Sequence, residues 1–281
     1  MTHIEVNNDL LPLKGSKQGV LNSTTGSVEH YDFSLANSSY EARVQAVTKV
    51  ASICYGNPKS LGSISLFDRL QAEAAGLPSS SYEFVPVLIT KEQFAKVDLK
   101  QCYKFGELVA NEQYLLTNLR ALIADVGHEE SLKYLNTSEE EIQIIRDNFK
   151  VYLFNVDLAT RAQMVRHRCS WQELSRRYVS GKKTPFEFYI SEKLKGIEHE
   201  SCDFGKYSTE YIIQTCIDHY NYAIATGVKP EEARRILPQA MMTTIWGAFQ
   251  PAQLANFFTL RLDKSAQKEI RCVAEAMNEL I

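Results

Sequence analysis

The sequence predicts an α+β protein, in which a central mixed or antiparallel sheet is flanked by long helices. Short apolar runs over residues 84–89, 151–156 and 243–249 have the length and composition of buried strands. Longer segments carry apolar residues at helical spacing, with capping residues at their ends. The chain of 281 residues shows no internal repeat, low-complexity tract or linker. We therefore predict one domain over residues 1–281.

The first third of the chain is expected to contain an early strand and two helices. Alternating apolar residues over 28–33 predict the strand. A capping box at 38–41 opens the first helix, which should end near Gly56. The second helix should cover residues 63–75 and stop at Gly76.

Residues 90–150 are expected to form a mostly helical insert. A helix over 112–126 closed by Gly127 is predicted, followed by a strongly capped helix start at Ser138. The strong caps and the balanced charge of the insert indicate a self-supporting, peripheral unit. Its removal over 95–145 should therefore leave any binding site intact.

The last third begins with an expected surface excursion over 179–206, which is rich in glycine, lysine and proline. A helix over 208–227 follows, and another starts at Pro230 and is broken at Pro238. Residues 252–281 are expected to be helical.

The composition excludes some classes of function. A net charge of −3 argues against binding nucleic acid through bulk charge. No stretch approaches the roughly 18–20 apolar residues of a membrane span. Residues 2–7 lack the basic start and apolar run of a signal peptide. We expect a cytoplasmic protein that contacts no membrane.

The cysteines do not predict a metal site. They form no C-x-x-C pair, so a zinc site is not expected, and most should be reduced and buried. The arginines beside Cys169 would lower the pKa of its thiol, although we do not expect it to act in catalysis. The six cysteines are Cys54, Cys102, Cys169, Cys202, Cys216 and Cys272.

The most informative stretch is residues 163–178, which contains four arginines, one histidine and a single acid. Apolar spacing predicts a helix from Asp157 up to this point. Arg166 and Arg168 are two positions apart and cannot share a helix face, so the helix should end here with its cations around an anion. The alternative is a solvated basic helix end, which the helix dipole would favour.

The pattern of these residues resembles the signature of the flavin-dependent thymidylate synthases of the ThyX type. The resemblance rests on Arg166-His167-Arg168, followed by Glu173, Ser175, Arg177 and Tyr178. Six residues separate Arg168 from Ser175, where the family has seven. We expect the missing residue to fall in a non-helical segment around 169–172, so that the later residues keep their places.

Three further segments resemble the family in the same order along the chain. Residues 80–83 match its early Thr/Ser-x-x-Glu element, although Phe84 stands where histidine is common. Residues 233–238 match Ala-Arg-x-x-Leu-Pro, and 256–271 match the closing pattern, with Ser265 at another common histidine position. The insert over 90–150 lies outside the resemblance.

The resemblance implies a homotetramer with shared active sites that converts dUMP to dTMP. It also implies FAD as cofactor, NADPH as its reductant and methylenetetrahydrofolate as the one-carbon donor. By the same resemblance, Arg261, Ser175 and His167 act in catalysis, and no metal is needed. The implied dUMP residues are Gln163, Arg166, Glu173, Ser175, Arg176, Arg177, Arg234 and Arg261. The implied FAD residues are Cys54, Ser80, Glu83, Arg166, His167, Arg168, Gln172, Gln250 and Asn256.

Two other functions are compatible with the sequence. One is a homologue that binds flavin or nucleotide in the same fold but lacks methyl transfer. The other is an RNA-binding protein with a basic helix, which the acidic balance and the lack of interleaved aromatic and basic residues disfavour.

Overall fold

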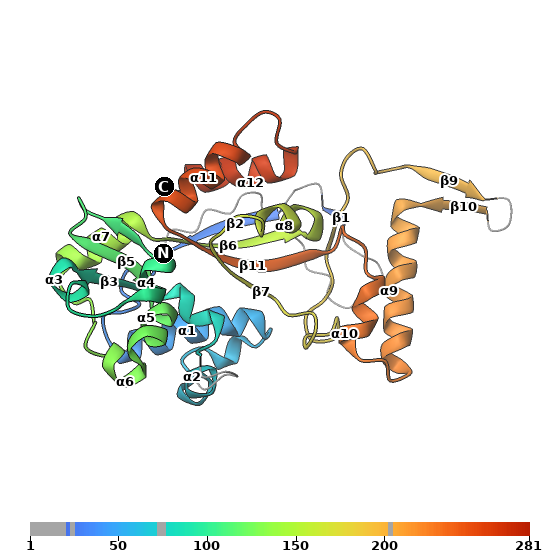
Figure 1. The fold of residues 1–281 in the computed structure, drawn as a ribbon. Coiled ribbons are helices and arrows are strands. Elements are labelled where there is room, and N and C mark those ends of the chain that lie inside the picture. The colour runs from blue at the N-terminus through green and yellow to red at the C-terminus, as the bar shows by residue number, and fades with distance from the viewer. Residues whose placement is uncertain (1–20, 23–25, 72–76, 202–204) are drawn as a thin grey trace.

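The computed structural model contains a four-stranded antiparallel sheet at its centre (Figure 1). Its strands, in spatial order, are β2 (Gly26–Tyr31), β6 (Lys150–Asp157), β11 (Met242–Phe249) and β7 (Ser170–Glu173). The predicted α+β class is thus confirmed, and the sheet is of the antiparallel type. The structure describes residues 21–22, 26–71, 77–201 and 205–281.

One face of this sheet packs against helices from the first third of the chain. Trp246 of β11 and Val151 of β6 belong to the same buried cluster as the apolar residues of α1 (Tyr40–Cys54) and α2 (Ile64–Gln71). Ser39 caps α1 by accepting a hydrogen bond from the Ala42 N–H at 3.1 Å. The predicted end of the second helix, residues 72–76, lies outside the described residues.

The opposite face is covered by helices that follow strands β6 and β11. The two faces alternate along each strand, so Phe154 and Phe249 face this side. The covering helices are α8 (Leu158–Met164), α11 (Pro251–Arg261) and α12 (Lys268–Glu279). Figure 1 shows α11 and α12 across the sheet from α1 and α2. The prediction of a continuous helix over 252–281 is wrong, because residues 262–267 interrupt it.

The insert is less helical than predicted, because it contributes strands to a second, three-stranded sheet. The order of this sheet is β3 (Pro86–Thr90), β5 (Tyr114–Asn118) and β4 (Glu107–Val109), all antiparallel. The helix predicted over 112–126 is therefore wrong in its first half. The helices of the insert are α3 (Lys91–Phe94), α4 (Lys100–Lys104), α5 (Leu119–Val126), α6 (His128–Ser131) and α7 (Glu139–Asn148).

The boundary between strand and helix at 114–126 has a local cause. Asn118 leaves the strand in extended conformation, and its side chain accepts a hydrogen bond from the Ala121 N–H, which starts α5. Gly127 ends α5, and a capping box of Ser138 and Glu141 starts α7, as predicted.

The expectation of a peripheral insert is also wrong. Leu99, Leu115 and Leu122 belong to the same buried cluster as Val47 and Trp246. The insert is thus part of the main core, and its removal would expose that core.

Buried polar contacts reinforce this attachment. Arg43 is fully buried and donates to the Ser131 carbonyl at 3.0 Å and to the Asn37 side chain at 2.7 Å. Asn37 donates in turn to the Asn136 side chain at 2.8 Å, and Asn136 bonds to both backbone groups of Leu88.

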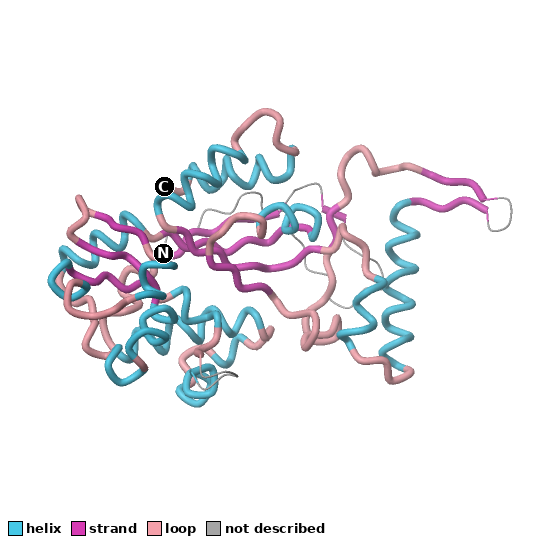
Figure 2. Tube along the Cα trace, in the orientation of Figure 1, coloured by secondary structure: helices cyan, strands magenta, loops and turns pink. Residues whose placement is uncertain are grey.

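A third group of elements lies beyond the far end of the central sheet (Figure 2). Phe186 and Phe188 are buried there, so the predicted surface excursion over 179–206 is only partly exposed. Ser208 caps the first helix of this group, as predicted. The elements are β1 (Leu21–Asn22), β8 (Phe188–Tyr189), β9 (Glu198–Ser201), β10 (Gly205–Ser208), α9 (Thr209–Ala225) and α10 (Pro230–Ala233). Within the residues placed by the structure, no helix has the length and apolarity required to cross a bilayer.

Candidate functional site

The arginine-rich segment leaves its helix early. Helix α8 ends at Met164, residues 165–169 form turns, and strand β7 starts at Ser170. The predicted helix end is confirmed, and the segment over 169–172 is non-helical as expected. Arg166 and Arg168 lie beyond the end of α8, so the described residues do not form the basic helix on which the RNA-binding alternative depends.

Arg261 and His167 meet directly. Arg261, at the end of α11, donates from Nε to His167 Nε2 at 2.8 Å and from Nη2 to the Gln163 carbonyl at 3.2 Å. Burial and the charge of Arg261 lower the pKa of His167 below 6.5, so the imidazole is neutral at pH 7. Its proton is then on Nδ1, which is buried and has no hydrogen-bond partner among the described residues.

Two further contacts fix this histidine. The ring packs on Phe257 with a centroid distance of 4.7 Å, and its carbonyl accepts a hydrogen bond from the Trp171 indole at 3.0 Å. Gly247 of β11 makes room for Trp171, since a Cβ at this position would lie 2.7 Å from the indole ring. The strand pairing therefore helps to orient His167.

A cavity of about 420 Å³ opens beside this pair. Neither Arg166 nor Arg168 forms a hydrogen bond or ion pair with any described residue, so two guanidinium groups line it without a counter-charge. Such groups favour an anionic ligand. The lining residues are Arg166, His167, Arg168, Ala252, Gln253, Asn256, Leu260 and Arg261.

A second cavity of about 380 Å³ adjoins the first and shares Arg168 and Gln253 with it. Three of the predicted FAD residues, Glu83, Arg168 and Gln250, line this second cavity. Glu83 accepts a hydrogen bond from Arg120 at 2.8 Å, so its charge is already compensated.

The insert contributes residues to this second cavity that the sequence did not reveal. Lys104, Phe105, Asn118 and Phe149 all line it, and none belongs to one of the four motif segments named in the sequence analysis. No sequence signal identifies them, because their position depends on the packing of the insert against α11.

Three other predicted FAD residues meet at the opposite end of β7. The Ser80 hydroxyl donates to the Gln172 side-chain oxygen, and the Ser175 N–H donates to the Cys54 carbonyl at 2.9 Å. Burial raises the pKa of the Cys54 thiol to about 12, so it stays protonated. The structure thus brings Cys54, Ser80 and Gln172 together with Ser175, a predicted catalytic residue.

Glu173 is held by residues that the sequence analysis missed. Arg161 donates to its carboxylate from Nε at 2.9 Å and also from Nη2, and the Thr243 hydroxyl donates at 3.0 Å. The pairing of β7 with β11 creates these contacts, so no local signal could have found them.

The remaining predicted dUMP residues lie elsewhere. Arg176 is buried and donates to the carbonyls of Thr184 at 2.6 Å and Pro185 at 3.2 Å, which gives it a structural role. Arg177 pairs with the Glu231 carboxylate at 3.2 Å, and Arg234 donates to the Glu231 carbonyl at 3.4 Å. Arg177 and Arg234 thus meet at Glu231, outside the cavity that Arg166 lines.

The expected reactive environment of Cys169 is not found. Burial raises the pKa of its thiol well above the usual value, and the charge of Glu83 raises it further. The neighbouring arginines do not offset this effect.

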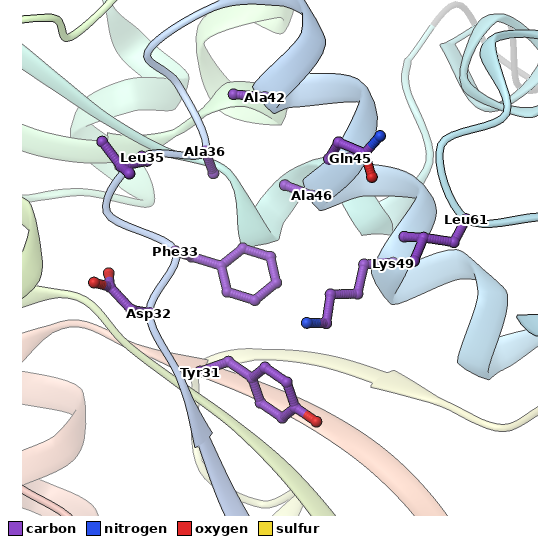
Figure 3. Close-up of a pocket in the computed structure, with 10 residues that line it drawn as sticks. All are labelled: Tyr31, Asp32, Phe33, Leu35, Ala36, Ala42, Gln45, Ala46, Lys49 and Leu61. Atoms are coloured by element: carbon purple, nitrogen blue, oxygen red, sulfur yellow. The ribbon is translucent and has the colours of Figure 1, made fainter. Parts of the chain in front are cut away.

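A separate cavity of about 310 Å³ lies between α1 and the segment after β2 (Figure 3). Its charged groups have partners within the chain: Lys49 lies 4.2 Å from the Tyr31 ring centroid, and Asp32 pairs with Arg146 at 2.9 Å. None of the residues predicted for FAD or dUMP lines this cavity, so it is not a candidate for their site.

Comparisons with known proteins agree with the resemblance. The flavin-dependent thymidylate synthase of Aquifex aeolicus is 35% identical over 147 residues, which cover 48% of this chain and 45% of that protein. The enzyme of the same name from Geobacter sulfurreducens is 33% identical over 134 residues, covering 46% and 56%. The chain thus spans about half the length of the curated relatives it matches.

A more distant likeness is found among solved structures. The crystal structure of a UMP/dUMP methylase, PolB from Streptomyces cacaoi bound with 5-Br UMP, aligns with a TM-score of 0.39 at 21% identity. The alignment covers 47% of this chain and 67% of that one.

The family match extends over most of the chain. The model for Thy1, described as thymidylate synthase complementing protein, matches residues 90–281. This range includes the insert, so the expectation that 90–150 lies outside the resemblance is wrong. The chain belongs to the Thy1 family of thymidylate synthase complementing proteins.

Proposed function

We propose that this protein is a flavin-dependent thymidylate synthase that converts dUMP to dTMP. Methylenetetrahydrofolate is the one-carbon donor, and FAD reduced by NADPH supplies the hydride. The observation that carries this proposal is the cavity beside Arg261 and His167, where Arg166 and Arg168 lack counter-charges within the described chain.

The residues present fit a phosphorylated flavin. Guanidinium groups bind phosphate oxygens through paired N–H donors, and the two unpartnered arginines can do so without breaking an existing ion pair. The buried Nδ1 of His167 is a donor that needs an acceptor, which a flavin carbonyl or a phosphate can provide. Arg166, His167 and Arg168 would hold the cofactor, together with Gln250 and Asn256.

The protein's contribution is placement and electrostatics. Burial and the charge of Arg261 keep His167 neutral, Arg261 orients it, and Phe257 shields one face of the ring from water. When bound, the flavin supplies the redox chemistry. The thiols of Cys54 and Cys169 have raised pKa values, so neither is assigned a role as nucleophile.

The nucleotide residues support a shared site. Arg177 and Arg234 lie at Glu231, whereas Arg166 and Arg261 line the cavity beside His167. We propose that all four bind one dUMP, with the two pairs contributed by different subunits. This arrangement supports the proposed homotetramer with sites built from several chains.

The test is purification followed by spectroscopy and a product assay. We expect a yellow tetramer whose visible spectrum is that of FAD, and formation of dTMP from dUMP, methylenetetrahydrofolate and NADPH. A colourless monomer that takes up no added FAD would refute the proposal.

A homologue that has lost methyl transfer is the second candidate. It is favoured by departures from the family pattern: the shortened spacing between Arg168 and Ser175, Phe84, and Ser265. Binding of FAD and dUMP without any dTMP formation would support this candidate instead.

A further inference from the structure

The insert brings a cation to the proposed flavin site. Lys104, the last residue of α4, lines the 380 Å³ cavity together with Arg168. Its Nζ lies 5.2 Å from the centroid of the Phe105 ring. Within the described part of the chain, it forms no ion pair with a carboxylate.

The acids near Lys104 are already engaged. Glu83, the only acid among the described residues that line this cavity, pairs with Arg120 at 2.8 Å. Glu107 accepts a hydrogen bond from the Ala252 N–H at 3.0 Å, at the start of α11. The cavity therefore has two uncompensated cations and no uncompensated acid, which makes its surroundings attractive to an anion.

Two hydrogen bonds hold the backbone beside Lys104 against α11. The Gln250 side chain donates to the Phe105 carbonyl at 2.9 Å, next to the bond between Ala252 and Glu107. Gln253, one turn further along α11, lines both cavities. These bonds hold Lys104 in the lining of the same cavity as Arg168.

We propose that Lys104 and Arg168 together bind the pyrophosphate of the flavin dinucleotide, so that the insert forms one wall of the cofactor site. This inference rests on the proposed function. An ammonium group is an effective point charge for phosphate, and the guanidinium adds paired donors. The phosphate of dUMP has similar chemistry, so the experiment separates the two sources.

The experiment compares full-length wild type with Lys104→Ala and with the matched control Lys96→Ala, an exposed lysine of the same insert. Each protein is titrated with FAD, with riboflavin, which has no phosphate, and with dUMP. Flavin binding is followed by fluorescence quenching, and dUMP binding by calorimetry. We expect Lys104→Ala to weaken FAD binding about tenfold, as for loss of one charged hydrogen bond. Riboflavin and dUMP binding should not change, and Lys96→Ala should match wild type.

Two further measurements separate a binding role from a structural one. If Lys104 binds FAD through its charge, Lys104→Arg should restore most of the FAD affinity, and the thermal unfolding midpoint of Lys104→Ala should equal that of wild type. The proposal is overturned if Lys104→Ala binds FAD normally, if riboflavin binding falls equally, or if only dUMP binding falls. Wild type that binds no flavin would instead refute the proposed function, on which this inference rests.

Discussion

Two groups of arginines that look alike in the sequence have opposite surroundings in the structure. Arg166 and Arg168 line a cavity without partners within the described chain, whereas Arg176 and Arg177 are engaged by carbonyls and a carboxylate. The difference comes from what each segment packs against. The first group faces α11, whose lining residues are uncharged except for Arg261, and the second faces the loop at 184–185 and Glu231.

This contrast separates charge that stabilises the fold from charge available to a ligand. A buried cation with acceptors holds backbone segments together, and its removal leaves those acceptors unsatisfied. A cation on a cavity wall without a counter-charge contributes little to folding, and its interaction energy is available for binding. Variants of both groups can test whether the separation holds.

The largest effect is expected from Arg176→Ala. The substitution removes two charged hydrogen bonds and the stacking of the guanidinium on Phe186, so the free energy of unfolding should fall by about 3 kcal/mol. Urea denaturation measures this change. Arg177→Ala is the control, since loss of an exposed ion pair should cost under about 1 kcal/mol. Equal stability of the two variants would contradict the structural role of Arg176.

Arg168→Ala should show the reverse behaviour. We expect FAD binding to weaken by about 2 kcal/mol, roughly 30-fold, while the free energy of unfolding changes by less than about 0.5 kcal/mol. Flavin titration and urea denaturation on the same preparation give both numbers. If the variant loses stability but keeps its FAD affinity, Arg168 stabilises the fold and does not bind the ligand.

Arg177→Ala should act on the substrate alone. Its guanidinium is half exposed and can exchange Glu231 for a phosphate, so we expect dUMP binding to weaken by about 1.5 kcal/mol. FAD affinity should not change. Calorimetry with dUMP that finds wild-type affinity would remove Arg177, Glu173 and Ser175 from the nucleotide site.

The smallest effect concerns pH and His167. The pKa of His167 is lowered in the folded protein. The unfolded chain therefore binds a proton at this residue near pH 6.5, whereas the folded chain binds it only at lower pH. The free energy of unfolding should therefore fall as the pH drops below about 6.5. His167→Gln should fall less steeply than wild type over the same range. His30 and His128 also have lowered pKa values, so only the difference between the proteins reports on His167.

Strands β6 and β11 of the central sheet could be predicted because their apolar runs are long and flanked by clear turns, whereas the short edge strand β7 was not predicted. The helix caps at Ser138 and Ser208 could be predicted for a similar reason, since capping is a contact between near neighbours. The capping box at 38–41 placed the cap of α1 at Ser38, one residue before the observed cap Ser39. The strand at 114–118 could not, because an apolar run of that length fits a helix equally well. Its pairing with β3 and β4 decides the outcome.

The site residues could be predicted where they belong to motifs that resemble the family. They could not be predicted where only tertiary packing places them in the site. Arg261 and His167 were both predicted to act in catalysis, and they are in contact, whereas the third predicted residue, Ser175, bonds to the Cys54 carbonyl instead. The partners of Glu173 depend on strand pairing, and the position of Lys104 depends on the packing of the insert. Short-range sequence patterns predict neither of these long-range contacts. The missing residue between Arg168 and Ser175 falls in turns and an edge strand, which can absorb it. Whether Glu173 and Ser175 keep their places on the nucleotide stays a prediction.

The position of β11 has a consequence for how this protein is made. Strand β11 lies between β6 and β7, although both are synthesised well before it. Until Met242 and the residues after it leave the ribosome, β6 keeps one unpaired edge and β7 has no partner in the central sheet. Unpaired strand edges can pair with strands of other chains. A nascent chain that still lacks β11 is therefore prone to aggregation. The need for chaperones should therefore be greatest just before β11 emerges from the ribosome.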